Sequence, residues 1–344
     1  MIQIEIKNKI GIIYLDRPQA LNALNCQMIG EIERALIGFE ENSEVRAILF
    51  DSKCERGFSA GGDLKEIYYD YIKNEVKAKK DEFFKKEFDL NKYIMTYPKP
   101  TIAHWYGVTM GGGIGLTIHS DLIIADETVN WAMPETSLGF VPDVSVGYYI
   151  SKLPQAVGQF VGLTGARLYP DDLLDLGLAD ILIDSKDYEK VLEKLFALNT
   201  DRPDLVGDFK KEIEIFSKKP GPTVNTETKE KIEKYFAKDK LSDIIKALEE
   251  GQTDDFAREN LEILKTRDPF MSEVQFEKYF LGKKLTREET IDLDLKIINQ
   301  GLNSGGIEEG IRTVMIDRGD KPSWPVKNFE DVDKKEVYNL LGIK

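Results

Sequence analysis

The strongest constraint on the fold is a repeated order of elements: a short apolar strand, a glycine-rich turn and then a helix. Glycine-rich turns at 57–62 and 111–115 each follow a predicted strand, at 45–50 and 101–105, and each opens a predicted helix. Strands that are separated by helices pair in parallel through crossover connections. This order therefore predicts an α/β core.

Hydrophobic periodicity predicts the other elements of that core. Apolar residues alternate with polar ones from 2 to 6 and then fill 10–15, which is typical of a β-hairpin. Apolar positions recur at helical spacing over 26–41 and predict an amphipathic helix. Short apolar runs predict three further strands, at 122–125, 129–132 and 181–183.

Helical patterns occupy much of the rest of the chain. Residues 65–97 predict helix, and the pattern is helical almost throughout after about residue 187. A Lys-Lys-Pro-Gly-Pro segment at 218–222 is the best candidate for a linker. We therefore predict a catalytic core over 1–200 and a helical C-terminal region over 201–344 that completes the site.

Composition excludes several classes of function. Hydrophobic residues make up 42% of the 344 residues and charged residues 31%, which indicates a globular chain and not a disordered one. A net charge of −14 argues against an extended nucleic-acid-binding face. No apolar run reaches the length of about 18 residues that a membrane span needs. The two cysteines, Cys26 and Cys54, have neither disulfide-framework nor metal-ligand spacing. We expect a cytoplasmic protein that binds no metal, no nucleic acid and no membrane.

The chain has two histidines, His104 and His119. Neither begins a zinc motif, since His104 lies in an apolar strand pattern and His119 near the end of a short apolar helix. We interpret both as structural histidines. Hydrolytic chemistry is then expected to use carboxylates.

A candidate pair of catalytic carboxylates lies in the stretch 133–147. Glu135 and Asp143 each follow a proline directly, and proline stiffens the backbone on which the acid sits. Apolar neighbours place the stretch against a core. Two rigidly held acids in an apolar setting are typical of acid–base or nucleophilic carboxylate chemistry. The alternative is an ordinary turn whose acids cap the following helix.

The two glycine-rich turns offer backbone N–H groups to a ligand. The second turn lacks the glycine spacing of a dinucleotide site, and no Walker phosphate loop is present. One N–H from each turn, from Gly62 and from Gly112, would form an oxyanion hole if the two pointed at one carbonyl oxygen. Such a donor contributes about 3–4 kcal/mol to catalysis. The alternative role of these glycines is close packing of helix on strand.

These motifs resemble those of the enoyl-CoA hydratase/isomerase (crotonase) superfamily. The resemblance lies in Phe-Ser-Ala-Gly-Gly-Asp-Leu at 58–64 and in Gly-Val-Thr-Met-Gly-Gly-Gly at 107–113. Met-Pro-Glu-Thr at 133–136, with Pro-Asp-Val at 142–144, is similar to the branch that hydrolyses 3-hydroxyacyl-CoA thioesters. The similarity covers nearly the whole chain and is thinner between about 190 and 265.

The resemblance implies a crotonase-like spiral core of ββα units with a helical C-terminal region. It implies an enzyme that hydrolyses a short-chain 3-hydroxyacyl-CoA thioester, with 3-hydroxyisobutyryl-CoA of valine breakdown as the expected substrate. No separate cofactor is implied, because CoA is part of the substrate, and the chain is a possible homo-oligomer. The expected catalytic residues are Glu135, Asp143, Gly62 and Gly112. The expected substrate-binding residues are Glu87, Gly112, Glu135, Asp143, Ser59, Ala60, Gly61 and Leu64.

Two departures from the family pattern affect these expectations. Hydratases of the superfamily carry a first catalytic glutamate just after the three glycines, and this chain has Gly115 there. Hydrolases usually have glycines after Pro-Asp-Val, and this chain has Ser145 and Val146, whose bulk would narrow the acyl pocket. A hydratase or isomerase that uses Glu135 alone, and a non-catalytic acyl-CoA-binding protein, stay open as alternatives. Whether Glu135 attacks the carbonyl or activates water also stays open.

Overall fold

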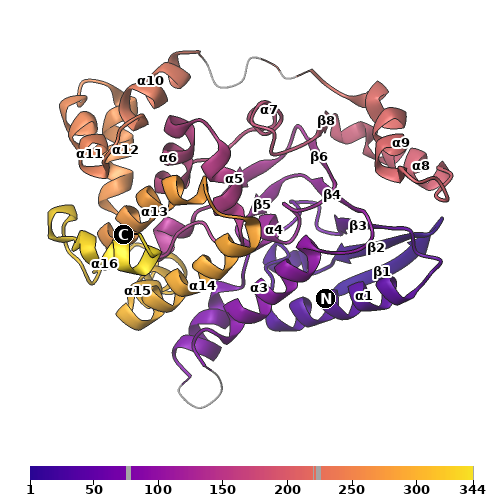
Figure 1. Ribbon diagram of the computed structural model, residues 1–344, viewed down its shortest axis with the longest axis horizontal. Helices are drawn as coiled ribbons and strands as arrows, with labels where there is room; N and C mark the ends of the chain where they lie inside the picture. Colours follow the sequence, from indigo (N-terminus) through magenta and orange to yellow (C-terminus); the bar gives the residue numbers. More distant parts are fainter. Residues whose placement is uncertain (75–78, 220, 222–225, 344) are drawn as a thin grey trace. The chain divides into compact units, whose positions relative to one another are not determined.

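The computed structural model describes residues 1–74, 79–219, 221 and 226–343, which form two compact units (Figure 1). Unit 1 comprises Met1–Gly62, Asp89–Trp131 and Leu168–Thr223. Unit 2 comprises Asp63–Phe88, Ala132–Arg167 and Val224–Lys344. The division between 1–200 and 201–344 stays a prediction, and the linker predicted at 218–222 lies partly outside the described residues.

Unit 1 is built on a six-stranded sheet with the order β1-β2-β3-β4-β6-β8. Its first two strands form the antiparallel hairpin that the alternation predicts, and the other neighbouring strands pair in parallel. The predicted α/β core is therefore confirmed. The strands are β1 Ile2–Lys7, β2 Ile10–Leu15, β3 Ala47–Ser52, β4 Thr101–Trp105, β6 Leu122–Asp126 and β8 Ile181–Ile183.

Helices cover both faces of this sheet. Ile10 and Ile12 of β2 belong to a buried cluster with α8 (Tyr188–Ala197) and α9 (Leu205–Ile213). Gly11 points the other way along the strand, and a Cβ there would lie 2.8 Å from the Phe39 ring of α1 (Cys26–Glu41). Alternation along one strand thus assigns α1 and the α8–α9 pair to opposite faces.

A second, two-stranded sheet of β5 (Val108–Met110) and β7 (Asn130–Ala132) adjoins the first glycine-rich turn. The glycines at 111–115 open the short helix α4 (Gly112–Gly115), as predicted. The strand directly before them is β5, which was not predicted, and the strand predicted at 101–105 is β4. The helix α7 (Pro170–Asp175) packs against β8.

Unit 2 is helical, and α13 (Pro269–Gly282) lies at its centre. Eleven of its residues are buried, so it has no solvent-facing stripe. It packs against α5, α6, α11 and α16. The helices that form this unit with it are α5 Val146–Lys152, α6 Gln155–Thr164, α10 Thr226–Phe236, α11 Leu241–Glu250, α12 Asp255–Lys265, α14 Arg287–Ser304, α15 Gly306–Ile311 and α16 Lys334–Leu341.

The helix predicted over 65–97 is interrupted. Asp63 caps α2 (Leu64–Glu66) by accepting hydrogen bonds from the N–H groups of Lys65 and Glu66, and one π-helical segment, Ile67–Ile72, follows. A regular helix resumes only with α3 (Glu82–Met95). Residues 75–78 of the prediction lie outside the described part of the chain.

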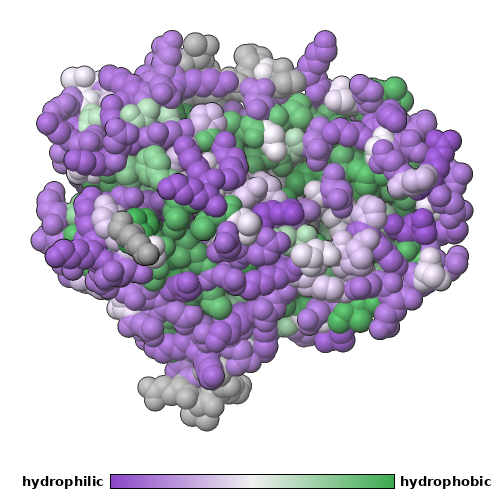
Figure 2. All heavy atoms as spheres, viewed as in Figure 1, coloured by the Kyte–Doolittle hydropathy of each residue, from purple (hydrophilic) through white to green (hydrophobic). Residues whose placement is uncertain are grey.

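The surface drawn in Figure 2 is mostly hydrophilic, with hydrophobic side chains in smaller groups between the hydrophilic ones. Among the described residues, no helix is long and apolar enough to cross a membrane.

Candidate active site

The carboxylate-bearing stretch of unit 2 is a tightly packed loop. Glu135 opens a short 3₁₀ helix, Glu135–Leu138, that ends at Gly139 in the left-handed region, with φ of 77°. A Cβ at Gly139 would lie 2.4 Å from the Gly306 carbonyl oxygen, and one at Gly310 would lie 2.2 Å from the Leu138 carbonyl carbon. Backbone contact with α15 through glycine therefore fixes the position of the Glu135 segment.

Helix α3 brings a third acid to this loop. The rings of Phe84 and Phe140 meet with centroids 6.1 Å apart, and Glu87 lies one turn after Phe84 on the same helix face. Glu87, Glu135 and Asp143 are each 4% exposed. The structure therefore buries all three acids that were predicted to contact substrate.

Burial changes the acidity of these groups. Burial raises the pKa of Glu87 to about 8. Burial and the nearby Glu87 carboxylate raise the pKa of Glu135 to about 8, against the opposing charge of Lys278. Burial, followed by the charges of Glu135 and Glu87, holds the pKa of Asp143 well above its usual range. Carboxyl groups with a pKa near neutrality are suited to give and take protons at physiological pH.

Two carboxylate oxygens in this cluster are available to a ligand. Within the described ranges, Glu87 Oε1 and Glu135 Oε2 are buried and have no hydrogen-bond partner. Buried polar atoms in proteins are nearly always satisfied, so an unsatisfied pair in one cluster indicates a place for a substrate group or water. If Glu135 were only a helix cap, its carboxylate oxygens would be used on backbone N–H groups. That interpretation does not explain the unsatisfied oxygen.

The glycine-rich turns of unit 1 lie side by side. Ser59 pairs with Thr109, and Gly57 with Gly107, as isolated bridges between the first turn and the segment that leads into the second. Gly61 has φ of 92°, which favours glycine, and a Cβ there would lie 3.2 Å from the Gly112 backbone nitrogen, a tight contact. In the part of the chain that the structure describes, the N–H groups of Gly62 and Gly112 donate no hydrogen bond. Both are thus available as donors.

The other predicted substrate-binding residues have clear structural tasks. The Ser59 hydroxyl is buried, donates to the Asn22 carbonyl at 2.9 Å and accepts from the Gly61 N–H at 3.2 Å. The Ala60 N–H donates to the Leu21 carbonyl at 2.9 Å. Leu64 is the half-buried first residue of α2. Ser59 and Ala60 thus shape the turn that presents Gly62.

The departures from the family pattern also have a structural context. Gly115 is buried in α4 and brings no carboxylate. Ser145 adopts φ of 63°, a conformation that favours glycine, and its hydroxyl donates to the Arg287 carbonyl at 3.0 Å. Val146 begins α5 with ordinary helical geometry. A glycine would adopt the backbone conformation at position 145 more readily, and hydrogen bonds hold the serine in that conformation.

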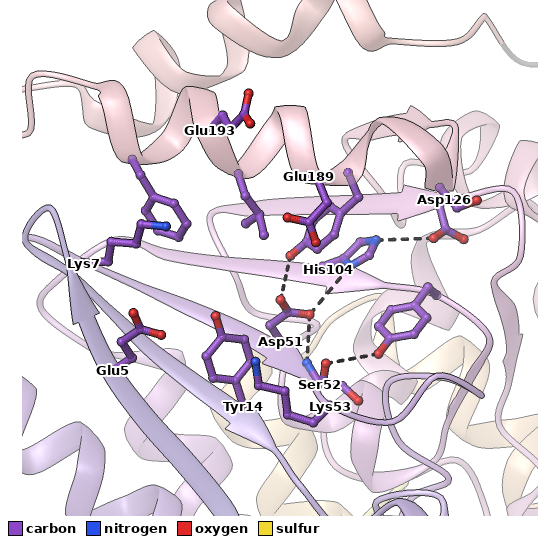
Figure 3. A pocket seen from close by; sticks show the side chains of 15 residues that line it. Glu5, Lys7, Tyr14, Asp51, Ser52, Lys53, His104, Asp126, Glu189 and Glu193 are labelled. Atoms are coloured by element: carbon purple, nitrogen blue, oxygen red, sulfur yellow. Dashed lines mark hydrogen bonds and ion pairs between the residues drawn. The ribbon is translucent and has the colours of Figure 1, made fainter.

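A polar pocket of about 580 Å³ in unit 1, lined by His104, was not predicted from the sequence (Figure 3). His104 lies between Asp51 and Asp126, with nitrogen–oxygen distances of 3.7 and 3.4 Å, and its ring stacks between Tyr188 and Tyr106. The interpretation of His104 as a buried structural residue fits this setting. The sequence does contain a signal for this pocket. The parallel neighbours β3, β4 and β6 each carry a titratable side chain near the carboxyl end, namely Asp51, His104 and Asp126.

Neither of the two cysteines forms a disulfide. Among the described residues, no group of three or more histidine, cysteine or acidic side chains has metal-site geometry.

The fold and the two sets of residues define a class. Residues 10–341 match the family described as enoyl-CoA hydratase/isomerase, and the chain belongs to this family, within the crotonase superfamily, whose members bind acyl-CoA substrates. It is 31% identical to the mitochondrial 3-hydroxyisobutyryl-CoA hydrolase of Xenopus laevis, over 96% of this chain and 87% of that protein.

Solved structures agree on the fold. A carnitinyl-CoA dehydratase from Mycobacterium thermoresistibile superposes with a TM-score of 0.87 at 28% identity, over 99% of this chain and 96% of the other. An enoyl-CoA hydratase from Rhodobacter sphaeroides gives 0.85 at 30% identity, with the same coverage. The predicted crotonase fold with a helical C-terminal region is thereby confirmed.

Proposed function

We propose that this protein hydrolyses a short-chain 3-hydroxyacyl-CoA thioester, with 3-hydroxyisobutyryl-CoA as the first candidate substrate. The observation that carries the proposal is the acid set. Glu135 and Asp143 are buried together, whereas Gly115 stands where hydratases carry their first catalytic glutamate. The name of the Xenopus laevis relative supports the same substrate class.

In the proposed reaction, the N–H groups of Gly62 and Gly112 bind the thioester carbonyl oxygen and stabilise the negative charge that develops on it. Glu135 has two possible roles. As a general base it takes a proton from water while the water oxygen bonds to the carbonyl carbon, and the proton then passes to the departing CoA sulfur as the C–S bond breaks. As a nucleophile its carboxylate bonds to the carbonyl carbon while the C–S bond breaks and the CoA thiolate leaves, which gives a mixed anhydride; water then hydrolyses the anhydride, releases the acid and its proton, and regenerates the carboxylate.

Asp143 is proposed to accept a hydrogen bond from the 3-hydroxyl of the substrate. Glu87 is proposed to contact the acyl group from α3. The reaction requires no metal and no cofactor other than the CoA of the substrate itself.

A hydratase acting on a short enoyl-CoA is the second candidate, because solved structures of similar fold include one named as a dehydratase and one named as a hydratase. Gly115 disfavours it, since double-bond hydration in this superfamily uses a pair of glutamates. A non-catalytic acyl-CoA-binding protein is disfavoured because neither candidate catalytic acid and neither candidate oxyanion glycine is lost.

One experiment separates these candidates. The protein is incubated with 3-hydroxyisobutyryl-CoA, the unsubstituted isobutyryl-CoA and crotonyl-CoA, while free thiol and the enoyl chromophore are followed in parallel. We expect thiol release, fastest from the hydroxylated substrate, without loss of the crotonyl chromophore. Loss of that chromophore without thiol release would assign the protein to the hydratases, and no turnover of either kind would favour a binding protein.

A further inference from the structure

The turn that carries Asp143 is held by a buried ion pair from two helices of unit 2. Lys278 of α13 is 3% exposed, donates a hydrogen bond from Nζ to the Pro142 carbonyl at 2.6 Å and pairs with Asp294 of α14 at 2.5 Å. The second Asp294 oxygen accepts from the Ser145 N–H at 2.9 Å. The pair thus forms hydrogen bonds with the backbone on both sides of Asp143, at Pro142 and at Ser145.

The turn would not be expected to keep this shape unaided. Val144 and Ser145 both have positive φ, of 47° and 63°, which is unfavourable for residues with side chains. Such strain persists where surrounding contacts over-determine the conformation. The hydrogen bonds of Ser145 to Asp294 and to the Arg287 carbonyl supply those contacts.

The local sequence leaves room for this lysine. A Cβ at Gly147 would lie 2.9 Å from Lys278 Nζ and 3.0 Å from its Cε. The ammonium group therefore occupies the space that a side chain at 147 would need. The whole arrangement, from Pro142 to Gly147, is built around Lys278.

Lys278 is also a cation among buried acids. Glu87 on α3, Glu135 on the 3₁₀ helix, Asp143 on the turn and Asp294 on α14 are all buried in the same unit. Burial raises the pKa of Glu135, Asp143 and Asp294, and the charge of Lys278 opposes that rise in all three. Without it, more of these acids would be protonated at neutral pH.

We propose that Lys278, paired with Asp294, is the positioning residue of this site: it holds the Asp143 turn in its strained shape and places a positive charge among the buried acids. This inference rests on the proposed thioester hydrolysis. It assigns to two residues far from the Pro-Asp motif in sequence a role in substrate discrimination and in the pH dependence of the reaction.

The test compares Lys278→Met with a matched control, Lys334→Met. Lys334 of α16 also pairs with a buried acid on α13, Glu273 at 2.7 Å, and its hydrogen bond goes to that carboxylate and not to the backbone of the Asp143 turn. The double variant Lys278→Met/Asp294→Asn removes both charges of the pair, so it does not leave an uncompensated carboxylate in the core. For each protein, kcat and KM for thiol release are measured against pH with 3-hydroxyisobutyryl-CoA and with isobutyryl-CoA.

We expect the half-activity point of the kcat profile to rise by about one pH unit or more in Lys278→Met, which is about a tenfold loss on the acidic side. It should rise less in the double variant, because the charge of Asp294, which raises the pKa of Asp143, is removed as well. The preference for the hydroxylated substrate should fall in both. Lys334→Met should keep both the wild-type profile and the wild-type preference. A profile and a preference in Lys278→Met that match those of Lys334→Met would overturn the inference.

An infrared measurement makes the test independent of turnover. The C=O stretch of protonated buried carboxyl groups is recorded against pH, and we expect it to persist to higher pH in Lys278→Met and in the double variant than in Lys334→Met. Absence of thiol release by the wild-type protein would refute the proposed function. An unchanged infrared titration would refute the role of Lys278 whatever the reaction.

Discussion

Asp143 and Glu135 lie eight positions apart in the chain, and different supports hold them. Glu135 sits on a short helix backed by glycine contacts with α15, while Asp143 sits between two residues held by the Lys278–Asp294 pair. Glu135 has a buried carboxylate oxygen without a partner among the described residues. We therefore propose that Glu135 takes part in the chemical step and that Asp143 recognises the substrate.

Asp143→Ala should reduce discrimination between acyl groups more than it reduces the chemistry. A charge-assisted hydrogen bond contributes about 1.5–3 kcal/mol, so the loss of kcat/KM should be about 10- to 150-fold greater for 3-hydroxyisobutyryl-CoA than for isobutyryl-CoA. Steady-state kinetics on both substrates check this. An equal loss on both would assign Asp143 to water or to Glu135, and no loss on either would leave it a structural turn residue.

At the scale of elements, the sequence predicts a helix or a strand well where the residues of that element themselves determine whether it forms. The helix over 26–41 and the strand over 181–183 were predicted with the bounds that the structure shows, because periodicity and apolar runs record burial directly. The helix over 65–97 was predicted as continuous, yet it breaks into a capped turn, a π-helical segment and α3. Its lysine and glutamate content favours helix without marking where one ends.

The residues that hold the site in place were harder to predict from the sequence than the candidate catalytic acids. Glu135 and Asp143 stand out in sequence because each follows a proline. Lys278 and Asp294 come from helices more than 130 residues later, and the hydrogen bond from Lys278 to Pro142 spans 136 positions. No local pattern marks a lysine on a helix as buried. The positive φ of Val144 was equally hidden, since valine does not favour that conformation.

A further prediction concerns His104, which lies on β4 between Asp51 of β3 and Asp126 of β6. Burial alone would lower the pKa of His104, but Asp126 and Asp51 outweigh burial and raise it. A raised pKa stabilises the fold fully below the unfolded value of about 6.5, and that stabilisation is lost as pH rises through the folded pKa. Tyr188 and Tyr106 stack on the His104 ring, and Tyr14 also lines the pocket.

His104→Gln should therefore destabilise the protein most at acidic pH, and the difference from wild type should shrink as pH rises above about 6.5. Thermal unfolding of both proteins between pH 5 and pH 9 measures it, with the values compared at each pH. A difference that does not depend on pH would mean that His104 contributes packing and no charge.

On the scale of the whole molecule, we expect the buried acids proposed for function to lower the stability of the fold at higher pH. The chain carries a net charge of −14, yet several of its acids lie in the interior. Burial raises the pKa of Glu87 to about 8. The folded state then binds a proton that the unfolded state releases, so stability is full below the unfolded pKa of about 4.3 and falls as pH rises through 8.

Glu87→Gln should remove this loss because glutamine stays neutral. At pH 8 we expect the variant to be more stable than wild type by at least about 1.4 kcal/mol, the equivalent of one pKa unit, with little difference at pH 4. Denaturant unfolding at both values measures it. Asp89→Asn, at an exposed position on the same helix, is the control and should change neither. A Glu87→Gln variant that is no more stable at pH 8 would contradict the burial of a neutral acid.

The central claim is that Glu135 performs thioester chemistry, and Glu135→Gln tests it most directly. Turnover of 3-hydroxyisobutyryl-CoA is measured by thiol release, and CoA affinity is measured separately by equilibrium binding. The glutamine keeps the shape of the side chain but can neither take a proton nor attack a carbonyl. We predict a fall in kcat of at least about 100-fold, with CoA affinity almost unchanged. A variant that folds and keeps near-wild-type turnover would show that Glu135 is a structural turn residue and that the proposed mechanism is wrong.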